Sequence, residues 1–429
     1  MRRTPLFVGF ALACALPLAA QTPPPPDAVV TIGAVHHIHS SVLGEDRPYL
    51  LYEPPGPRGA PLPVVILLDG DVHFHHTTGA VRFLRDQGRM PPVRVIAVPN
   101  TSDRTRDLTP AVISDTALRT AAPTAGGADR MLRFLADELL PEVERDYGRA
   151  PLRVLVGHSL GGLFAEYALL TRPEVFQAYI AISPSMSWDH ERLTDSLLAR
   201  LAREPRPRGW FYATMGALEP EDEMIAPFRR VERAFRRRAP GTLEWRFTVL
   251  AGEDHGSTPY RSTYDGLETI FRVFLVPRDS VVALGIAGLD RRYAELRSRF
   301  GFPDRTPEAA LNTLGNLLRA DGRASRRAQA LDAFRENGRR FPRSANVYDS
   351  MGDGFRALGQ REAAIICYGA SVRTGRAFPD EGAVYSGSWI APQSLAKMGV
   401  VARELGRTAW TPEAIPERVT ADCLAERAR

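Results

Sequence analysis

The stretch 157–162, with the sequence GHSLGG, constrains this chain more than any other feature. It directly follows the apolar run 153–156, which is typical of a buried strand, and it precedes a helical pattern that starts near Leu163. A serine on a tight strand-to-helix turn needs small neighbours because the backbone there is strained and crowded. The pattern therefore predicts a nucleophile elbow with Ser159 as the nucleophile. A chance glycine-rich turn is the less favoured alternative.

The rest of the stretch 29–276 repeats the alternation of apolar runs and helical patterns. Continuous apolar strands separated by amphipathic helices predict an α/β fold with a mostly parallel sheet covered on both faces. Residues 36–52 are expected to form an antiparallel pair that enters this sheet. The expected core strands are 63–68, 93–98, 153–156, 178–183, 210–215 and 243–250.

A nucleophilic serine needs a base, and in this kind of fold the base follows it in the chain. His255 lies in the loop 252–257, just after the last predicted strand. The other histidines precede Ser159 or lie close to it in the chain. We therefore expect His255 to be the base, although a surface loop histidine is the alternative.

The acid of such a triad is expected after strand 210–215. Glu219 is the first carboxylate in that loop and is our choice; Asp222 is the second choice. Glu221 and Glu223 also lie there, and each of the four could simply be a solvated acid at a helix start. Because three acids follow Glu219, partial rescue of its loss by a neighbour is expected.

An oxyanion hole needs main-chain N–H groups that point at the developing charge. The start of the helix after Ser159 offers the N–H of Leu160. A second donor is expected after the strand that ends at Leu68, where Gly70 and Asp71 are the candidates.

The same loop carries an alternation of acids and histidines that resembles a metal site. We favour a polar loop that lines the cleft, because serine hydrolysis needs no metal. The prediction is therefore no metal and no cofactor. The residues of this alternation are Asp69, Asp71, His73, His75 and His76.

Two arginines leave the carboxyl end of the strand at 93–98. Ligands of open α/β sheets bind at that edge, so Arg104 and Arg106 are candidates for binding an anionic group of the substrate. An ion pair within the loop, to Asp103 or Asp107, is an equally favoured alternative.

The N-terminus predicts export. A short basic start and an apolar run predict a signal peptide over residues 1–20, cleaved near Ala20–Gln21, and a proline-rich linker over 21–28. The mature chain would then be periplasmic or secreted, without a membrane span; a membrane anchor and a lipoprotein through Cys14 are disfavoured. Pairing of Cys367 with Cys423 stays open. The net charge of +5, without a long basic run, disfavours nucleic acid as a partner.

The strand signal stops near residue 280. In the region 281–379, Gly315 and Gly352 correspond at a 37-residue shift, and Phe334 and Tyr368 correspond at a 34-residue shift. The second unit resembles a tetratricopeptide repeat closely and the first resembles it loosely. Two units rarely stand alone, so we expect them to pack on the catalytic domain or on the segment 380–429, whose structure the sequence does not indicate.

Together these motifs resemble the putative-esterase (esterase D-like) family of α/β-hydrolases, and in particular its siderophore-esterase-like branch. The resemblance covers about residues 29–276 and implies an α/β-hydrolase domain over 29–280. It also implies Ser159 as nucleophile, His255 as base and Glu219 as acid. The matching stretches are 67–70, 104–110, 140–143, 157–163, 183–185 with Trp188, and 252–257, and Trp188 is expected to contact the substrate.

The sequence thus predicts an exported serine esterase that acts on a small-molecule ester through an acyl-enzyme. A siderophore-type, feruloyl or acetyl ester is the expected class of substrate. The alternatives are an acyltransferase that uses the same triad, or a binding protein in which the repeats carry the function and the hydrolase domain is degenerate. A protein partner bound by the repeats is a further expectation.

Overall fold

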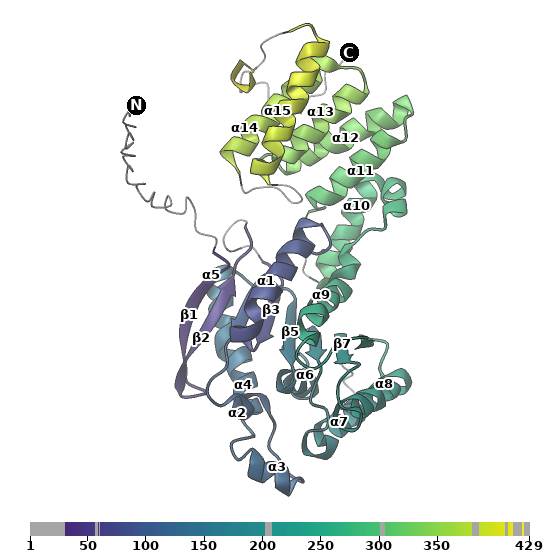
Figure 1. Ribbon diagram of the computed structural model, residues 1–429. Coiled ribbons are helices and arrows are strands. Elements are labelled where there is room, and N and C mark those ends of the chain that lie inside the picture. Colours follow the sequence, from purple (N-terminus) through teal and green to yellow (C-terminus); the bar gives the residue numbers. More distant parts are fainter. Residues whose placement is uncertain are drawn as a thin grey trace, which may run out of the picture. The chain divides into compact units, whose positions relative to one another are not determined.

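The computed structural model describes residues 31–55, 59, 61–201, 208–300, 305–379, 386–407, 411–414 and 423. The predicted signal peptide and the proline-rich linker both lie outside these residues. Figure 1 shows an α/β part followed by a region made of helices. No helix in the described ranges is long and apolar enough to cross a membrane.

An eight-stranded sheet forms the centre of the α/β part, in the order β1-β2-β4-β3-β5-β6-β7-β8. The first two strands form an antiparallel hairpin, β2 pairs antiparallel with β4, and the other pairings are parallel. The predicted α/β fold is confirmed. The strands are β1 (Ala34–Ser40), β2 (Glu45–Tyr52), β3 (Val64–Leu68), β4 (Arg94–Val98), β5 (Arg153–His158), β6 (Ala178–Ile182), β7 (Gly209–Gly216) and β8 (Leu243–Leu250).

Successive strand residues point to opposite sides of the sheet, and the central strands are buried at every position, so both faces are apolar and helices cover both. Val65 and Leu67 of β3 pack in one core with side chains of α1 and α9, whereas Val64 and Ile66 pack in the other core with side chains of α6, α7 and α8. The helices of this part are α1 (Gly70–Asp86), α2 (Arg104–Leu108), α3 (Thr116–Ala121), α4 (Ala128–Arg133), η1 (Phe134–Leu139), α5 (Leu140–Tyr147), α6 (Leu160–Thr171), α7 (Trp188–Arg200), η2 (Glu221–Ile225), α8 (Ala226–Arg238) and α9 (Thr258–Phe271).

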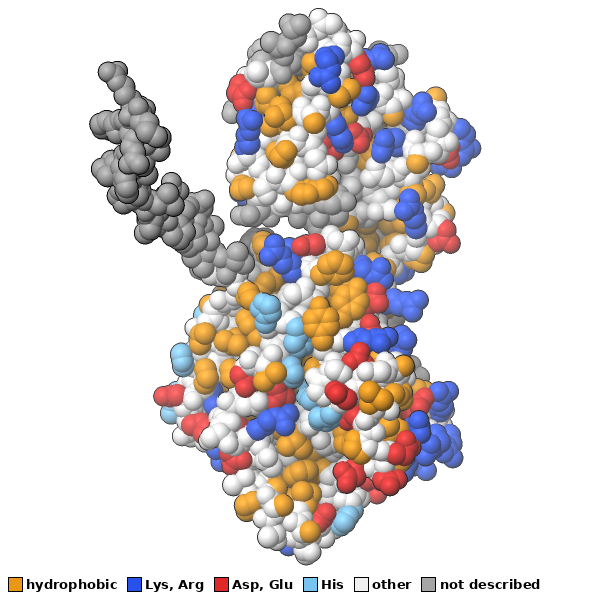
Figure 2. Space-filling view, viewed as in Figure 1, with side chains coloured by type: hydrophobic (Ala, Val, Ile, Leu, Met, Phe, Trp, Pro, Cys, Tyr) orange, Lys and Arg blue, Asp and Glu red, His pale blue; other side chains and the backbone are white. Residues whose placement is uncertain are grey.

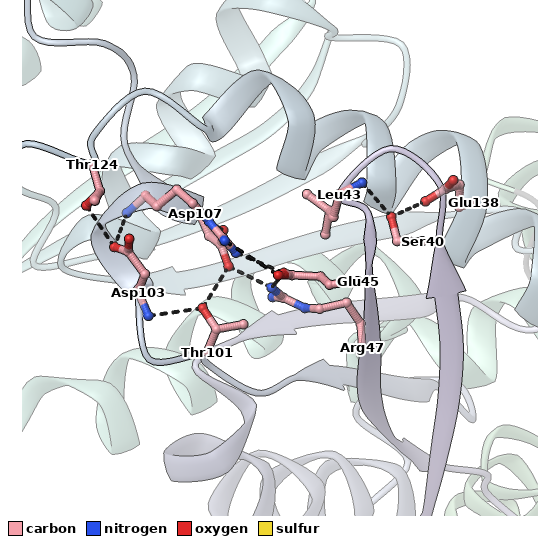
Figure 3. Close-up of polar contacts among 10 residues, drawn as sticks. Ser40, Leu43, Glu45, Arg47, Thr101, Asp103, Asp107, Thr124 and Glu138 are labelled. Atoms are coloured by element: carbon pink, nitrogen blue, oxygen red, sulfur yellow. Dashed lines mark hydrogen bonds and ion pairs between the residues drawn. The ribbon is translucent and has the colours of Figure 1, made fainter.

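A buried arginine ties the β1–β2 hairpin to the segment after β4 (Figure 3). Arg47 is 1% exposed, and its Nη1 donates to Glu45 Oε1 at 2.8 Å and to Asp107 Oδ2 at 2.7 Å. Thr101 Oγ1 also donates to Asp107 Oδ2, at 3.3 Å. A charge removed from water needs such partners, so this network fixes where the segment 99–108 runs.

The C-terminal region repeats one packing contact. The ring of Phe334 fills the space that a side chain at Gly315 would need, and the ring of Tyr368 does the same at Gly352. The two glycines and the two rings are the pairs that correspond in the sequence, so the two helix pairs have the same internal packing. The elements are η3 (Arg272–Phe274), α10 (Arg278–Phe300), α11 (Glu308–Ala320), α12 (Ala324–Arg340), α13 (Ala345–Ala357), α14 (Arg361–Ala377), α15 (Gly387–Glu404) and η4 (Pro412–Ala414).

Two features of this region were not readable from the sequence. The expected boundary near residue 280 falls at the start of α10, whose residues Leu289 and Tyr293 belong to the same core as Phe274. Beyond residue 380, the chain forms α15, and a disulfide joins Cys367 to Cys423.

Candidate active site

Ser159 occupies a strained turn between β5 and α6. Its φ of 59° and ψ of −116° lie outside the regions that residues with side chains usually adopt. The turn is held on both sides, because the Ser159 N–H donates to Ile182 O at 2.9 Å and the Ser159 carbonyl accepts from Leu163 N at 3.0 Å. The helix begins at Leu160, three residues earlier than the sequence indicates, so it starts directly after the serine.

The glycines around Ser159 are required by close backbone contacts. A Cβ on Gly157 would lie 2.2 Å from the carbonyl oxygen of Gly161, and one on Gly162 would lie 2.9 Å from Cα of Pro184. Neither contact is tolerable, which is the physical reason for small residues in the GHSLGG stretch.

His255 and Glu219 meet in loops that follow β8 and β7. The Nδ1–H of His255 donates to Glu219 Oε2 at 2.7 Å. The other carboxylate oxygen, Oε1, accepts from Ser183 Oγ at 2.5 Å and from the Gly216 N–H at 3.0 Å. Glu219 thus has a partner on each oxygen while its side chain is fully buried.

The carboxylate form of Glu219 is stabilised by these donors. Burial acts to raise the pKa of Glu219, but the hydrogen bonds from His255, Ser183 and Gly216 outweigh it, so the pKa lies below its ordinary value. The three acids that follow in the chain are exposed on η2. Of the four candidate acids, only Glu219 is brought to His255.

The hydroxyl of Ser159 makes its hydrogen bond elsewhere. Its Oγ lies 3.4 Å from Ser185 Oγ, and among the described residues no hydrogen bond joins it to the ring of His255. The residue before the serine does reach the loop of the base, because His158 Nε2 lies 2.8 Å from the main-chain oxygen of His255. Hydrogen bonds of free enzymes are often long at this point and shorten when substrate binds.

Two helix N-termini lie at the same edge of the sheet. β3 and β5 pair in parallel, with Leu67 opposite Val156, so α1 and α6 both begin just beyond that edge. A Cβ on Gly161 would lie 3.2 Å from Asp69 Oδ2, which shows how close the two turns come. The first N–H groups of a helix lack partners inside it. Those of Gly70, Asp71 and Leu160 are therefore suitable donors for an oxyanion.

The two candidate substrate-binding arginines are both ion-paired. Arg104 binds both carboxylate oxygens of the buried Asp69, and its Nη2 also donates to the carbonyl of His158 at 2.9 Å. Arg106 binds Asp107 and Glu45 at 2.7 and 2.8 Å. The ion-pair alternative therefore describes both residues, but with Asp69 as the unforeseen partner of Arg104.

The alternation of acids and histidines after β3 does not converge on one point. It lies at the start of α1 and along it, where Asp69 and His73 are buried, whereas Asp71 and His75 are exposed. In the described part of the chain, no group of three or more His, Cys, Asp or Glu side chains is arranged to hold a metal ion.

The histidines instead form a series of ring contacts that reaches the base. Ring centroids lie 4.6 Å apart for His255 and His158, 5.7 Å apart for His158 and His73, and 5.2 Å apart for His73 and His76. Figure 2 shows histidine side chains in a row on this face, next to exposed hydrophobic side chains. Burial lowers the pKa of His76 and of His158 to about 4, so both rings are neutral at pH 7.

Trp188 begins α7, where the next residue binds the segment 113–115, a contact that the sequence did not predict. Its Nε1 is buried and has no hydrogen-bond partner. The next residue, Asp189, has a φ of 48° and accepts the N–H groups of Ile113, Ser114 and Asp115 at 2.7–2.9 Å. These bonds hold the segment before α3 against the start of α7. The sequence did not indicate this contact, because it depends on a strained backbone at Asp189, and residue types do not reveal such strain.

Comparisons with known proteins find similar esterases. A family model described as a putative esterase matches residues 40–246. The chain is 40% identical over 171 residues to the ferri-bacillibactin esterase BesA of Bacillus subtilis. This match covers 35% of this chain and 57% of BesA. The match thus spans little more than half of that relative's length.

Solved structures extend the likeness. An IroE-like serine hydrolase from Shewanella oneidensis aligns with a TM-score of 0.58 and 25% identity, over 70% of this chain and 98% of that one. An uncharacterised protein from Capnocytophaga ochracea aligns with a TM-score of 0.53 and 15% identity, over 86% of this chain and 99% of that one. The second likeness shows the fold alone, and it reaches into the C-terminal helices.

Proposed function

Because residues 40–246 belong to the putative esterase family, we propose that the chain is a serine esterase with Ser159, His255 and Glu219 as its triad. The observation that carries the proposal is the 2.7 Å bond between His255 and the buried Glu219, in loops at the edge of the sheet where Ser159 precedes α6. A buried carboxylate bound to one nitrogen of a half-exposed imidazole orients the other nitrogen for proton transfer.

The reaction follows from these positions. Ser159 Oγ attacks the ester carbonyl while His255 Nε2 takes its proton, and Glu219 stabilises the imidazolium. The carbonyl oxygen becomes negatively charged and accepts the N–H of Leu160 and of Gly70 or Asp71. The bond to the alcohol breaks, the alcohol leaves with the proton from His255, and an acyl group stays on Ser159. A water molecule then attacks the carbonyl of the acyl-enzyme while His255 takes its proton. The bond to Ser159 Oγ breaks, the carboxylic acid leaves, and the serine hydroxyl is restored.

The relatives suggest the class of substrate. BesA is named for a ferric siderophore, and the chain is 40% identical to it over 171 residues. We propose a multi-ester, siderophore-type substrate as the first choice and feruloyl or acetyl esters as the second. An acyltransferase would use the same acyl-enzyme with an alcohol in place of water. Export to the periplasm or the medium, and a protein partner for the C-terminal helices, are further proposals from the sequence.

One comparison tests the catalytic proposal. Purified chain is mixed with a p-nitrophenyl acyl ester, and the expected result is a burst of nitrophenol equal to the enzyme concentration, followed by slower turnover. Ser159→Ala is expected to remove both phases, while Ser185→Ala, which changes the neighbouring hydroxyl, keeps the burst. Equal activity of wild type and Ser159→Ala would contradict the proposal. A panel of trilactone siderophores, feruloyl esters and acetyl esters then ranks the substrates.

A further inference from the structure

The base of the proposed triad is held by hydrogen bonds more than by packing. The side chain of His255 is 42% exposed, and it lies in the loop between β8 and α9. An exposed side chain on a loop is free to change rotamer unless polar contacts fix it. The orientation of this imidazole therefore depends on what binds its ring and its main chain.

A closed set of hydrogen bonds surrounds His255. Glu219 binds the ring, Ser183 binds Glu219, and Ser183 Oγ lies 2.9 Å from Thr258 Oγ1. Thr258 Oγ1 in turn lies 3.2 Å from the carbonyl oxygen of His255. The same carbonyl oxygen is 2.8 Å from Nε2 of His158.

Counting protons shows which of these groups is decisive. Each hydroxyl carries one proton, and that of Ser183 goes to the Glu219 carboxylate at 2.5 Å, the stronger acceptor. Thr258 Oγ1 donates to the carbonyl oxygen of His255 at 3.2 Å, and it also lies 2.9 Å from Ser183 Oγ, which competes for its one proton. The Nε2–H of His158, at 2.8 Å, is therefore the shorter and undivided donor to the carbonyl of His255.

We propose that His158 is a positioning residue for the base: its ring holds the main chain of His255 and so keeps the imidazole aligned between Glu219 and Ser159. The inference rests on the proposed function. His158 is the residue before the nucleophile, so the same bond ties the elbow to the loop of the base. The histidine in GHSLGG thereby gains a role that the glycines and the serine do not supply.

The surroundings of His158 fit this role. The main-chain carbonyl of His158 accepts from Arg104 Nη2 at 2.9 Å, so its main chain is fixed while its ring binds the carbonyl of His255. Burial, with smaller contributions from His255 and His73, keeps the ring neutral at pH 7. A neutral ring has one N–H, and the contact with a carbonyl requires it on Nε2.

The test compares four variants of the full chain. His158→Leu removes the donor and keeps the bulk, whereas His158→Gln keeps an N–H donor of similar reach. Thr258→Val removes the hydroxyl and keeps the shape. His76→Leu is the matched control, because His76 is also partly buried and neutral but has no contact with His255. Circular dichroism and the unfolding temperature identify any variant that fails to fold.

Two readouts are taken for each variant. The first is kcat and KM on a p-nitrophenyl acyl ester. His158→Leu is expected to lower kcat about 10- to 100-fold with little change of KM, since a small misplacement of a catalytic group has that effect. His158→Gln restores most of kcat, and Thr258→Val loses less than His158→Leu. Folded His158→Leu with wild-type kcat, or a larger loss in Thr258→Val, would overturn the inference.

The second readout does not require turnover. In the proton NMR spectrum, the proton on Nδ1 of His255, which is hydrogen-bonded to Glu219, gives a downfield resonance. This resonance is assigned by its loss in His255→Ala. It should broaden in His158→Leu and persist in His158→Gln and His76→Leu. An unchanged resonance in His158→Leu would overturn the positioning role. An inactive wild type with these expected resonances would instead contradict the proposed function and leave the positioning role supported.

Discussion

Arg104 and Asp69 form a two-point ion pair directly behind the elbow of Ser159. Arg104 Nη2 lies 2.9 Å from Asp69 Oδ2, and its Nε binds Oδ1 of the same carboxylate. Asp69 is 4% exposed, and Asn100 Nδ2 also donates to it at 2.8 Å. The guanidinium is thus part of the scaffold that holds α1 near α6.

The first prediction follows from this pair. Arg104→Met leaves a buried carboxylate without its cation, so we expect the free energy of unfolding to fall by about 3 kcal/mol. The matched control is Arg133→Met, an exposed i,i+4 pair with Asp129, which should change it by less than about 0.5 kcal/mol. Urea unfolding at pH 7 measures both. A rise of KM restricted to an acidic ester, with unchanged stability, would assign Arg104 to substrate binding instead.

The second prediction concerns the triad acid. Glu219→Gln is expected to lower kcat about 10²- to 10⁴-fold, because the amide no longer fixes the tautomer of His255 or stabilises its charged form. Asp222→Asn should change kcat less than about twofold, since Asp222 is exposed on η2. Rescue by neighbours, which the cluster of acids in the sequence suggested, is therefore not expected. Steady-state kinetics of the single and double variants decide this.

The third prediction uses a buried acid that the mechanism does not need. Glu166 of α6 is fully buried, Thr194 donates to its Oε2 at 3.3 Å, and its Oε1 has no hydrogen-bond partner. Burial raises the pKa of Glu166 to about 8. Because the folded pKa lies above the unfolded one, the contribution to stability is full below about pH 4.5 and is lost as the pH rises through about 8.

Glu166→Gln should remove this pH dependence. The difference in unfolding free energy between wild type and variant is expected to shift by up to about 5 kcal/mol in favour of the variant from low pH to pH 8.5. Urea unfolding of both proteins across that range, at constant ionic strength, measures it. Parallel stability curves would mean that Glu166 is ionised in the folded protein at neutral pH.

Short-range patterns and chain order account for what the sequence could predict. The elbow is a local pattern, and the order Ser159, Glu219, His255 reduced the candidates for base and acid to a few. The ion-pair partner of Arg104 could not be predicted from the sequence, because Asp69 lies 35 residues away and only the pairing of β3 with β4 brings it close. The same holds for Asp189, which binds a segment about 75 residues earlier.

The expected boundary near residue 280 stays a prediction for a different reason. A loss of strand signal near residue 280 says where the sheet ends, not where its covering helices end. Tyr293 Oη donates to the carbonyl of Phe274 at 3.0 Å, and both rings pack in the core beneath α9. Helical periodicity is the same for a helix that covers a sheet and for one that belongs to a repeat.

The fourth prediction concerns the disulfide between α14 and residue 423. Cys367 and Cys423 are buried and 56 residues apart, so the link should contribute about 2–4 kcal/mol by restricting the unfolded chain. Dithiothreitol is expected to lower the unfolding temperature of wild type but not of the double variant Cys367→Ser/Cys423→Ser. Ester hydrolysis at 25 °C should be unchanged in both. Loss of activity on reduction would tie the C-terminal helices to the site.

The last prediction locates the end of the catalytic part by truncation. α9 begins three residues after His255, and its 14 residues rise by about 21 Å, so the end of α9 that leads to α10 lies well away from the base. A chain cut after residue 304 keeps α10 and should retain kcat/KM within about threefold, although the face of α10 that meets α11 becomes exposed and lowers the unfolding temperature. A chain cut after residue 280 loses the bond from Tyr293 to Phe274 and the packing around it, and we expect it to be insoluble or unfolded. Expression, circular dichroism and p-nitrophenyl ester hydrolysis compare the two. A folded, inactive chain ending at residue 304 would show that helices beyond α10 contribute to the substrate site.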